Sequence, residues 1–188
     1  MRALAIALPA LLLLLPKTSI AEAPAGNSIK VLSNTYDPGF KEVSPLDLKD
    51  IRSAAALRSK DGKQVQVFLS NGNFTVDQMT NEYVLPLKSK KEFILVLTFH
   101  NGTNPAVDGT YSPKAGYGKP FWSSVVVRIL SGPKGTNASL GANEGTCSIK
   151  GVSGGRVTGS FQLKSRNGDK VMAEAVGTFD APLTTSKY

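Results

Sequence analysis

The sequence has little of the chemistry that most metal and disulfide sites need. Among 188 residues there is one cysteine, Cys147, and one histidine, His100. These counts exclude Cys₂His₂ and Cys₄ zinc sites, a His₃ catalytic zinc site and an intramolecular disulfide. Type 1 copper sites and copper–zinc dismutase sites also need more histidine. We therefore expect no metal and no cofactor, and we expect an apolar core to hold the fold together.

The sequence also has no apolar run long enough to cross a bilayer. The longest run, Ala3 to Leu15, has 13 residues, whereas a spanning helix needs about 20. Arg2 precedes the run, and small residues at Ser19 and Ala21 follow it. This order predicts a secretory signal peptide over residues 1–21, cleaved after Ala21. An uncleaved membrane anchor is the alternative.

Removal of residues 1–21 changes the charge of the chain. The full sequence has 22 Lys and Arg against 14 Asp and Glu, a formal net charge of +8. Arg2 and Lys17 leave with the signal peptide, so the mature chain of 167 residues has a charge of +6. We expect this chain to be secreted or periplasmic, without a transmembrane span. Its oligomeric state is left open.

The basic residues are dispersed, apart from the cluster Lys88-Ser89-Lys90-Lys91. Such a cluster could favour an anionic component of the cell envelope, such as lipopolysaccharide or an acidic glycan. The alternative is a solvated turn that guards the apolar strand after it. Because no recognition motif accompanies the charge, we expect no nucleic-acid partner.

The sequence also lacks a convincing amphipathic helix. From residue 53 onward, the apolar residues recur mainly with a period of two. Asp61-Gly62 separates two strand-like runs, which predicts a hairpin. Residues 92–100 are almost entirely apolar, which is typical of a strand buried on both faces. A further strand is expected at 124–130, and alternation over 146–182 predicts a three-stranded meander.

These patterns predict an all-β fold: a single antiparallel β-sandwich or small β-barrel of about 8–10 strands, with at most one short helix. One domain should cover residues 43–188. Residues 22–42 should be a flexible lead-in, with a possible edge strand at 28–33. Ser44-Pro45 could open a short helical turn before Ile51.

Catalytic patterns are weak. Gly151-Val152-Ser153-Gly154-Gly155 matches the nucleophile elbow of α/β-hydrolases, but strand-like segments lie on both sides, so a β-turn fits better. His100 ends an apolar strand, where bonding to a loop is the simpler interpretation. Calcium in the loop 101–109 is a weak alternative, since the EF-hand spacing is missing. We assign no catalytic residue.

The segment 111–122 is the first candidate for a ligand site, because aromatic and basic side chains alternate in a loop rich in glycine and proline. Aromatic rings with neighbouring lysines can stack on sugar rings or on flat acidic ligands. Alternatively, the rings fold back over one end of the barrel. The candidate ligand-binding residues are Tyr111, Lys114, Tyr117, Lys119, Phe121 and Trp122.

The sequence thus favours an exported, non-enzymatic, basic β-domain that binds a ligand or envelope partner: a glycan, a lipid or another anionic component. Two alternatives stay open. One is a small secreted hydrolase that uses a pair of carboxylates. The other is a structural or assembly subunit.

Overall fold

The computed structural model of the chain describes residues 51–75, 92–125 and 142–186 with their side chains, and the backbone of residues 28–31, 46–47, 126–129 and 136–139. The expected signal peptide at 1–21 and the cluster Lys88–Lys91 lie outside these residues. No helix among them has the length and hydropathy of a membrane span.

The described chain is almost entirely β-structure, which confirms the all-β prediction. Eleven strands form one sheet, slightly more than the eight to ten expected. A short 3₁₀ helix covers Pro113–Ala115. The strands are β1 (Ser28–Val31), β2 (Leu46–Asp47), β3 (Ser53–Arg58), β4 (Gln64–Ser70), β5 (Phe93–His100), β6 (Gly109–Tyr111), β7 (Trp122–Ile129), β8 (Thr136–Ser139), β9 (Glu144–Lys150), β10 (Arg156–Asn167) and β11 (Lys170–Thr185).

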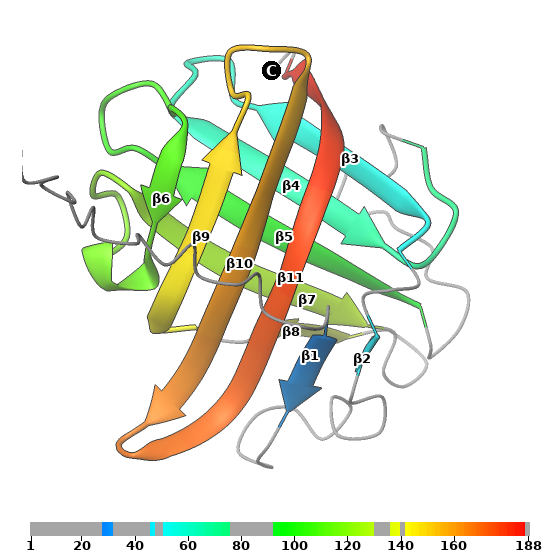
Figure 1. Cartoon of the computed structure of the whole chain (residues 1–188), viewed down its shortest axis with the longest axis vertical. Helices are drawn as coiled ribbons and strands as arrows, with labels where there is room; N and C mark the ends of the chain where they lie inside the picture. The colour runs from blue at the N-terminus through cyan, green and yellow to red at the C-terminus, as the bar shows by residue number, and fades with distance from the viewer. Residues whose placement is uncertain are drawn as a thin grey trace, which may run out of the picture.

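The sheet curls until its ends almost meet. Its strand order is β6-β9-β10-β11-β3-β4-β5-β7-β8, and Figure 1 shows the first four strands crossing in front of the last five. Ser112, directly after β6, forms a bridge with Trp122 at the start of β7. The Ser112 N–H donates to Phe121 O at 2.8 Å. The eight strands from β6 round to β7 therefore form a nearly closed barrel.

Two expected hairpins are present where the turn residues predicted them. Gly62 between β3 and β4 has a φ of 73°, and Gly168 between β10 and β11 has a φ of 59°. Glycine accepts this left-handed conformation without the steric cost of a Cβ atom. The Asp61 carboxylate fixes the first turn by accepting from Ser59 Oγ at 2.7 Å and from Lys63 N at 3.1 Å.

Two details of the prediction were wrong. The sheet is mixed and not purely antiparallel, because β11 pairs with β3 in parallel. The expected helical turn after Ser44-Pro45 is replaced by β2, which pairs with β1. The possible edge strand within the lead-in 22–42 is present as β1, which pairs with β11. Each error concerns a contact between segments far apart in sequence, which local patterns do not report.

The barrel interior is filled by one apolar cluster to which all eight strands contribute. Its largest fully buried members include Tyr111, Phe93, Phe99 and Phe161. An eight-stranded barrel is just wide enough for side chains to fill it. The interior is therefore a core that stabilises the fold and leaves little room for a bulky ligand.

A smaller buried cluster lies on the outer face of β3, β4 and β5. It contains Ala55, Phe68, Ile94 and Val96. On β5 these outward residues alternate with Phe93, Leu95 and Leu97, which belong to the interior cluster. The expectation that the segment 92–100 is a strand buried on both faces is confirmed.

Cys147 lies on β9 inside the barrel and is 0% exposed. Burial raises the pKa of its thiol to about 12, partly offset by the Ser123 hydroxyl. The thiol is free. Its accessible surface is nil, so an intermolecular disulfide would require the barrel to open. Cys147 therefore packs as a small buried apolar residue.

We predict that Ellman's reagent modifies Cys147 in the folded protein only as fast as the protein unfolds, because the reactive thiolate is both buried and disfavoured. The folded state holds the thiol proton more tightly than the unfolded chain. The stability from this burial is therefore complete below pH 9.0 and is lost as the pH rises toward about 12. Unfolded protein should react at once, and rapid labelling of the folded protein would contradict the burial.

Candidate functional site

Several loops meet at one end of the barrel, which we call the loop end. It comprises the β3–β4 turn (59–63), the β5–β6 loop (101–108), the β6–β7 loop (112–121) and the β9–β10 turn (151–155), at the top and left of Figure 1. Hydrogen bonds join the first two segments: Ala106 N donates to Gly62 O at 2.8 Å. Asp108 joins the second to the last, accepting from Gly151 N at 3.0 Å and Val152 N at 2.8 Å.

Tyr111, a predicted ligand residue, is a core residue. It lies on β6, is 0% exposed, and its ring meets that of Phe99 edge-on with centroids 5.4 Å apart. Its hydroxyl donates to Val107 O at 2.8 Å and accepts from Val107 N at 3.2 Å. Burial raises the pKa of this phenol. The Tyr111 ring therefore cannot stack on a ligand. It follows the alternative given above, in which the rings of this segment fold back over one end of the barrel.

Tyr117 is the opposite case, since it is 85% exposed. The edge of its ring packs against Trp122, with centroids 5.1 Å apart and planes at 86°. The ring of His100, at the end of β5, lies nearly parallel to the Tyr117 ring, with centroids 6.5 Å apart and planes at 20°. His100 pairs directly with Trp122 across β5 and β7, so these two strands hold both rings beside Tyr117. We call these three residues the ring cluster.

His100 is the member of the ring cluster that the sequence did not suggest. Its Nδ1 accepts a hydrogen bond from Gly102 N at 3.1 Å. The neutral imidazole then carries its proton on Nε2. His100 therefore bonds to the following loop, as its position at a strand end indicated, although the loop partner is an amide and not a carbonyl.

Phe121 connects the ring cluster to the core. It is 43% exposed, and its ring is tilted against that of Tyr111 with centroids 5.3 Å apart. Its φ of 55° is the only positive φ of a non-glycine residue in the described part of the chain. Such a backbone persists only where the surroundings determine it. Here Gly109 provides space, because a Cβ atom there would be 3.3 Å from the Phe121 ring.

The two predicted lysines are at the surface. The side chain of Lys114 is 68% exposed, with its Nζ 4.0 Å from Glu144 Oε1, which is a weak pair. Lys119 is exposed between Tyr117 and Phe121. The structure thus brings Tyr117 and Trp122 together, and Tyr111 and Phe121 together, with the lysines on the surface of the same segment.

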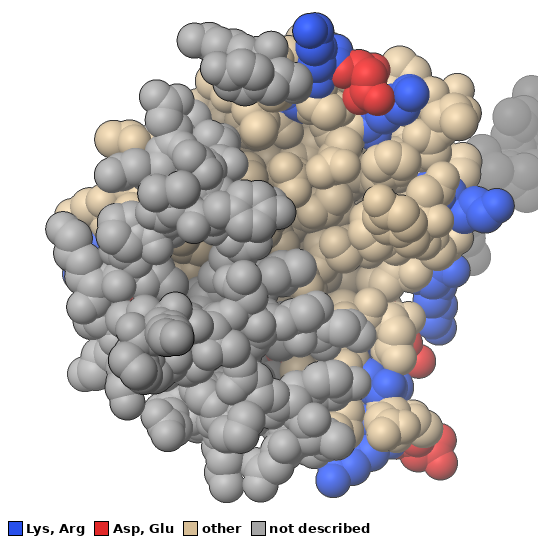
Figure 2. Space-filling view, turned by 180° about the vertical axis from the view of Figure 1, so that it is seen from behind, with Lys and Arg blue, Asp and Glu red and all other residues tan. Residues whose placement is uncertain are grey.

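Positive charge does not gather into one broad patch on the described surface seen in Figure 2, where blue side chains are spread along the margin. Some of the described basic side chains are paired with acids: Arg156 Nε with Asp180 at 2.6 Å, and Lys164 Nζ with Glu174 at 3.2 Å. The described surface therefore offers a polyanion only local contacts, as the dispersed sequence charge indicated.

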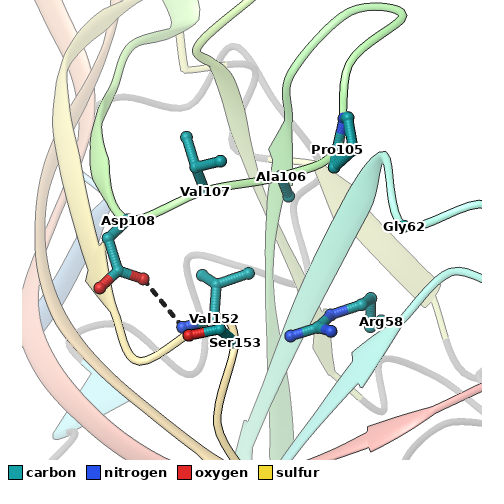
Figure 3. A pocket seen from close by; sticks show the side chains of 8 residues that line it. All are labelled: Arg58, Gly62, Pro105, Ala106, Val107, Asp108, Val152 and Ser153. Carbon is teal, nitrogen blue, oxygen red and sulfur yellow. Dashed lines mark hydrogen bonds between the residues drawn. The ribbon is translucent and has the colours of Figure 1, made fainter.

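A second feature of the loop end is a pocket of about 260 Å³ (Figure 3). It is lined by Arg58, Gly62, residues 105–108, Val152 and Ser153. Arg58 ends β3 opposite Val65, on the same strand face as Ala56, so its side chain starts at an inward position. The sequence signal for this position is the alternation Ala54, Ala56, Arg58, which places a charge at the end of an apolar row.

The pocket does not resemble a hydrolase site. Ser153 lies in the β9–β10 turn, which leads into β10 and not into a helix, so the nucleophile-elbow geometry is missing. Among the lining residues Asp108 is the single carboxylate, whereas glycoside hydrolysis uses two. Within residues 51–75, 92–125 and 142–186, no three His, Cys, Asp or Glu side chains are grouped as metal ligands.

Comparison of this chain with protein-family models, with curated proteins and with solved structures found no match.

Proposed function

We propose that this protein is an exported, non-enzymatic β-barrel that binds glycans at its loop end, with Tyr117 as the stacking residue. One observation carries the proposal. The large apolar side chains exposed in the described part of the chain are Val107, Tyr117 and Phe121, with exposures of 43%, 85% and 43%. All three lie in two successive loops at one end of the barrel. Single exposed apolar residues are ordinary, but their concentration in one region marks an interaction site.

The support beneath Tyr117 favours a stacked ligand. The planes of Tyr117 and Trp122 are nearly perpendicular, so Trp122 supports Tyr117 without covering both faces of its ring. A side chain with two rotatable bonds that is already held loses little entropy on binding. The C–H face of a sugar ring matches the flat apolar face of such a ring, and Lys119 nearby can pair with an acidic substituent.

A glycan fits better than a lipid or an assembly partner. An acyl chain needs an apolar cavity, and the interior of this barrel is filled by its own core. A protein interface of ordinary size needs an apolar centre with many contributing side chains. The three exposed apolar residues, with exposed lysines beside them, provide less apolar surface than such an interface needs. They provide enough for one or two sugar rings.

The test is isothermal titration of the protein with an acidic oligosaccharide, oligogalacturonate, and a neutral one, maltohexaose. We expect Tyr117→Ala to weaken binding at least about tenfold, or about 1.4 kcal/mol, without loss of stability, because the side chain is 85% exposed. Lys119→Gln should weaken only the acidic ligand and reduce its dependence on salt.

Lys170→Gln is the matched control. Lys170 is exposed at the β10–β11 hairpin, outside the loop end, so the same substitution should leave both affinities unchanged. The proposal fails if the wild-type protein binds neither oligosaccharide, or if Tyr117→Ala binds both as well as the wild type does.

A further inference from the structure

We propose that the pocket beside Arg58 is a second binding site, for a small organic monocarboxylate whose two oxygens pair with the guanidinium of Arg58 while its apolar part lies against the pocket wall. This site is separate from the ring cluster and does not depend on the proposed glycan binding. Within the described part of the chain, it is where buried donor atoms of a charged side chain have no hydrogen-bond partner.

The guanidinium of Arg58 is the central observation. Its Nε and Nη2 atoms are buried, and neither has a hydrogen-bond partner among the residues described. Desolvated donors of a charged group are costly unless they are paired. Native proteins pair nearly all such groups, and an exception indicates a ligand, water or ion at that place. Two other arginines with described side chains are paired: Arg156 with Asp180, and Arg166 with Glu144.

The two unpaired atoms define the shape of the ligand group. Nε and Nη2 direct their N–H bonds from the same edge of the planar guanidinium, nearly parallel to each other. Two parallel donors match the two oxygens of a carboxylate, which is the bidentate geometry that arginine forms most strongly. Figure 3 shows this side chain extending from β3 toward Val152 and Ser153.

The walls define the rest of the ligand. Pro105, Ala106, Val107 and Val152 give an apolar lining. The volume of about 260 Å³ equals roughly nine waters at about 30 Å³ each, and it lies just below the range of about 300–1,000 Å³ that accommodates drug-sized ligands. A short carboxylic acid fits both the volume and the chemistry.

Asp108 limits the charge that the pocket accepts. Its two oxygens accept from Gly151 N and Val152 N, and these bonds lower the pKa of the carboxyl. Asp108 is therefore ionised at neutral pH, and no ion pair joins it to Arg58 in the described part of the chain. Besides Arg58, the charges at this place are Asp108 and Lys150, whose ammonium also lowers the pKa of Asp108. These three side chains together carry a net charge of +1. A single carboxylate satisfies that balance, whereas a phosphate dianion would add an unpaired negative charge beside Asp108.

The test is calorimetric titration of the protein with hexanoate and, separately, with inorganic phosphate. We expect hexanoate to bind one site in the millimolar range or tighter and phosphate to bind more weakly. Arg58→Met should weaken hexanoate at least tenfold. Arg58→Lys should also weaken it, because lysine keeps the charge but loses the parallel donors.

Two controls separate a ligand site from a structural role. Arg156→Met removes an exposed, paired arginine near the same turn and should leave hexanoate affinity unchanged. Arg58→Met should unfold at the same temperature as the ligand-free wild type or higher, since it removes unpaired buried donors. A purely structural Arg58 would instead lower that temperature.

Failure of hexanoate to saturate the wild type, unchanged affinity in Arg58→Met, or tighter binding of phosphate than of hexanoate would each overturn the proposal. Tyr117→Ala distinguishes this proposal from the glycan site, because that variant should keep its hexanoate affinity.

Discussion

Replacing Phe99 by alanine is expected to lower the free energy of unfolding by about 3–5 kcal/mol. Phe99 is 0% exposed on β5 and belongs to the cluster that fills the barrel interior. The centroid of its ring lies 5.4 Å from that of Tyr111 and 5.9 Å from that of Phe179. These rings come from β6 and β11, so the cavity would open between three strands that surround it and could collapse only in part.

Tyr117→Ala serves as the matched control for Phe99→Ala, because it removes an aromatic ring that is 85% exposed. Exposed truncations of this kind usually change stability by less than about 0.5 kcal/mol. Denaturant unfolding followed by Trp122 fluorescence measures both variants. Equal midpoints for Phe99→Ala and Tyr117→Ala would show that the barrel interior is not the packed core described above.

Gly159→Ala is the second substitution with a large expected effect. A Cβ atom at Gly159 would lie 2.0 Å from Ser148 O and 2.4 Å from the Phe179 ring. The first of these neighbours is backbone of β9 and cannot rotate away. Gly159 pairs with Phe179 across β10 and β11, so the glycine provides the space in which that ring lies. Overpacking of a tight core costs about 1–3 kcal/mol and occasionally more, and we expect at least the upper end of that range.

Gly155→Ala provides the comparison within the same strand region. Gly155 lies in the β9–β10 turn, has no positive φ, and has no neighbour within 4 Å of an added Cβ atom. Alanine there should be neutral, or stabilising by up to about 1 kcal/mol through the reduced freedom of the unfolded chain. If thermal unfolding shows that Gly159→Ala is tolerated as well as Gly155→Ala, the close approach of β9 and Phe179 to Gly159 is wrong.

Local patterns predicted most of the sheet because each hairpin carries its own signal. Asp61-Gly62 and Asn167-Gly168 mark two turns, and alternation identifies the strands beside them. The parallel pair β11–β3 has no such signal. Its strands are joined by no turn, and their neighbourhood depends on how the complete sheet curls. The expected helical turn at Ser44-Pro45 failed for the same reason. The two residues of β2 pair with β1, a contact that the local sequence does not report.

The candidate site was predicted as a region but not in its details. The aromatic composition of residues 111–122 located the loop, but it could not show that Tyr111 points into the barrel while Tyr117 points out. Strand alternation places Tyr111 once the start of β6 is known, whereas Tyr117 lies in the β6–β7 loop, where no strand period applies. The sequence did not predict His100 and Arg58 as site residues. They belong to the site because β5 pairs with β7 and because one face of β3 points inward, and both are features of the tertiary structure.

The parallel pair between β3 and β11 also has a consequence for the order in which the molecule can fold. Thr184 Oγ1 donates to Ala56 O at 3.3 Å across 128 residues of sequence. During synthesis, the edge of β3 that pairs with β11 therefore stays unpaired until β11 has been made. Contacts of such long range slow folding and leave a strand edge unpaired meanwhile. A chain that completes its barrel so late remains incompletely folded for longer, which would suit the export that we propose.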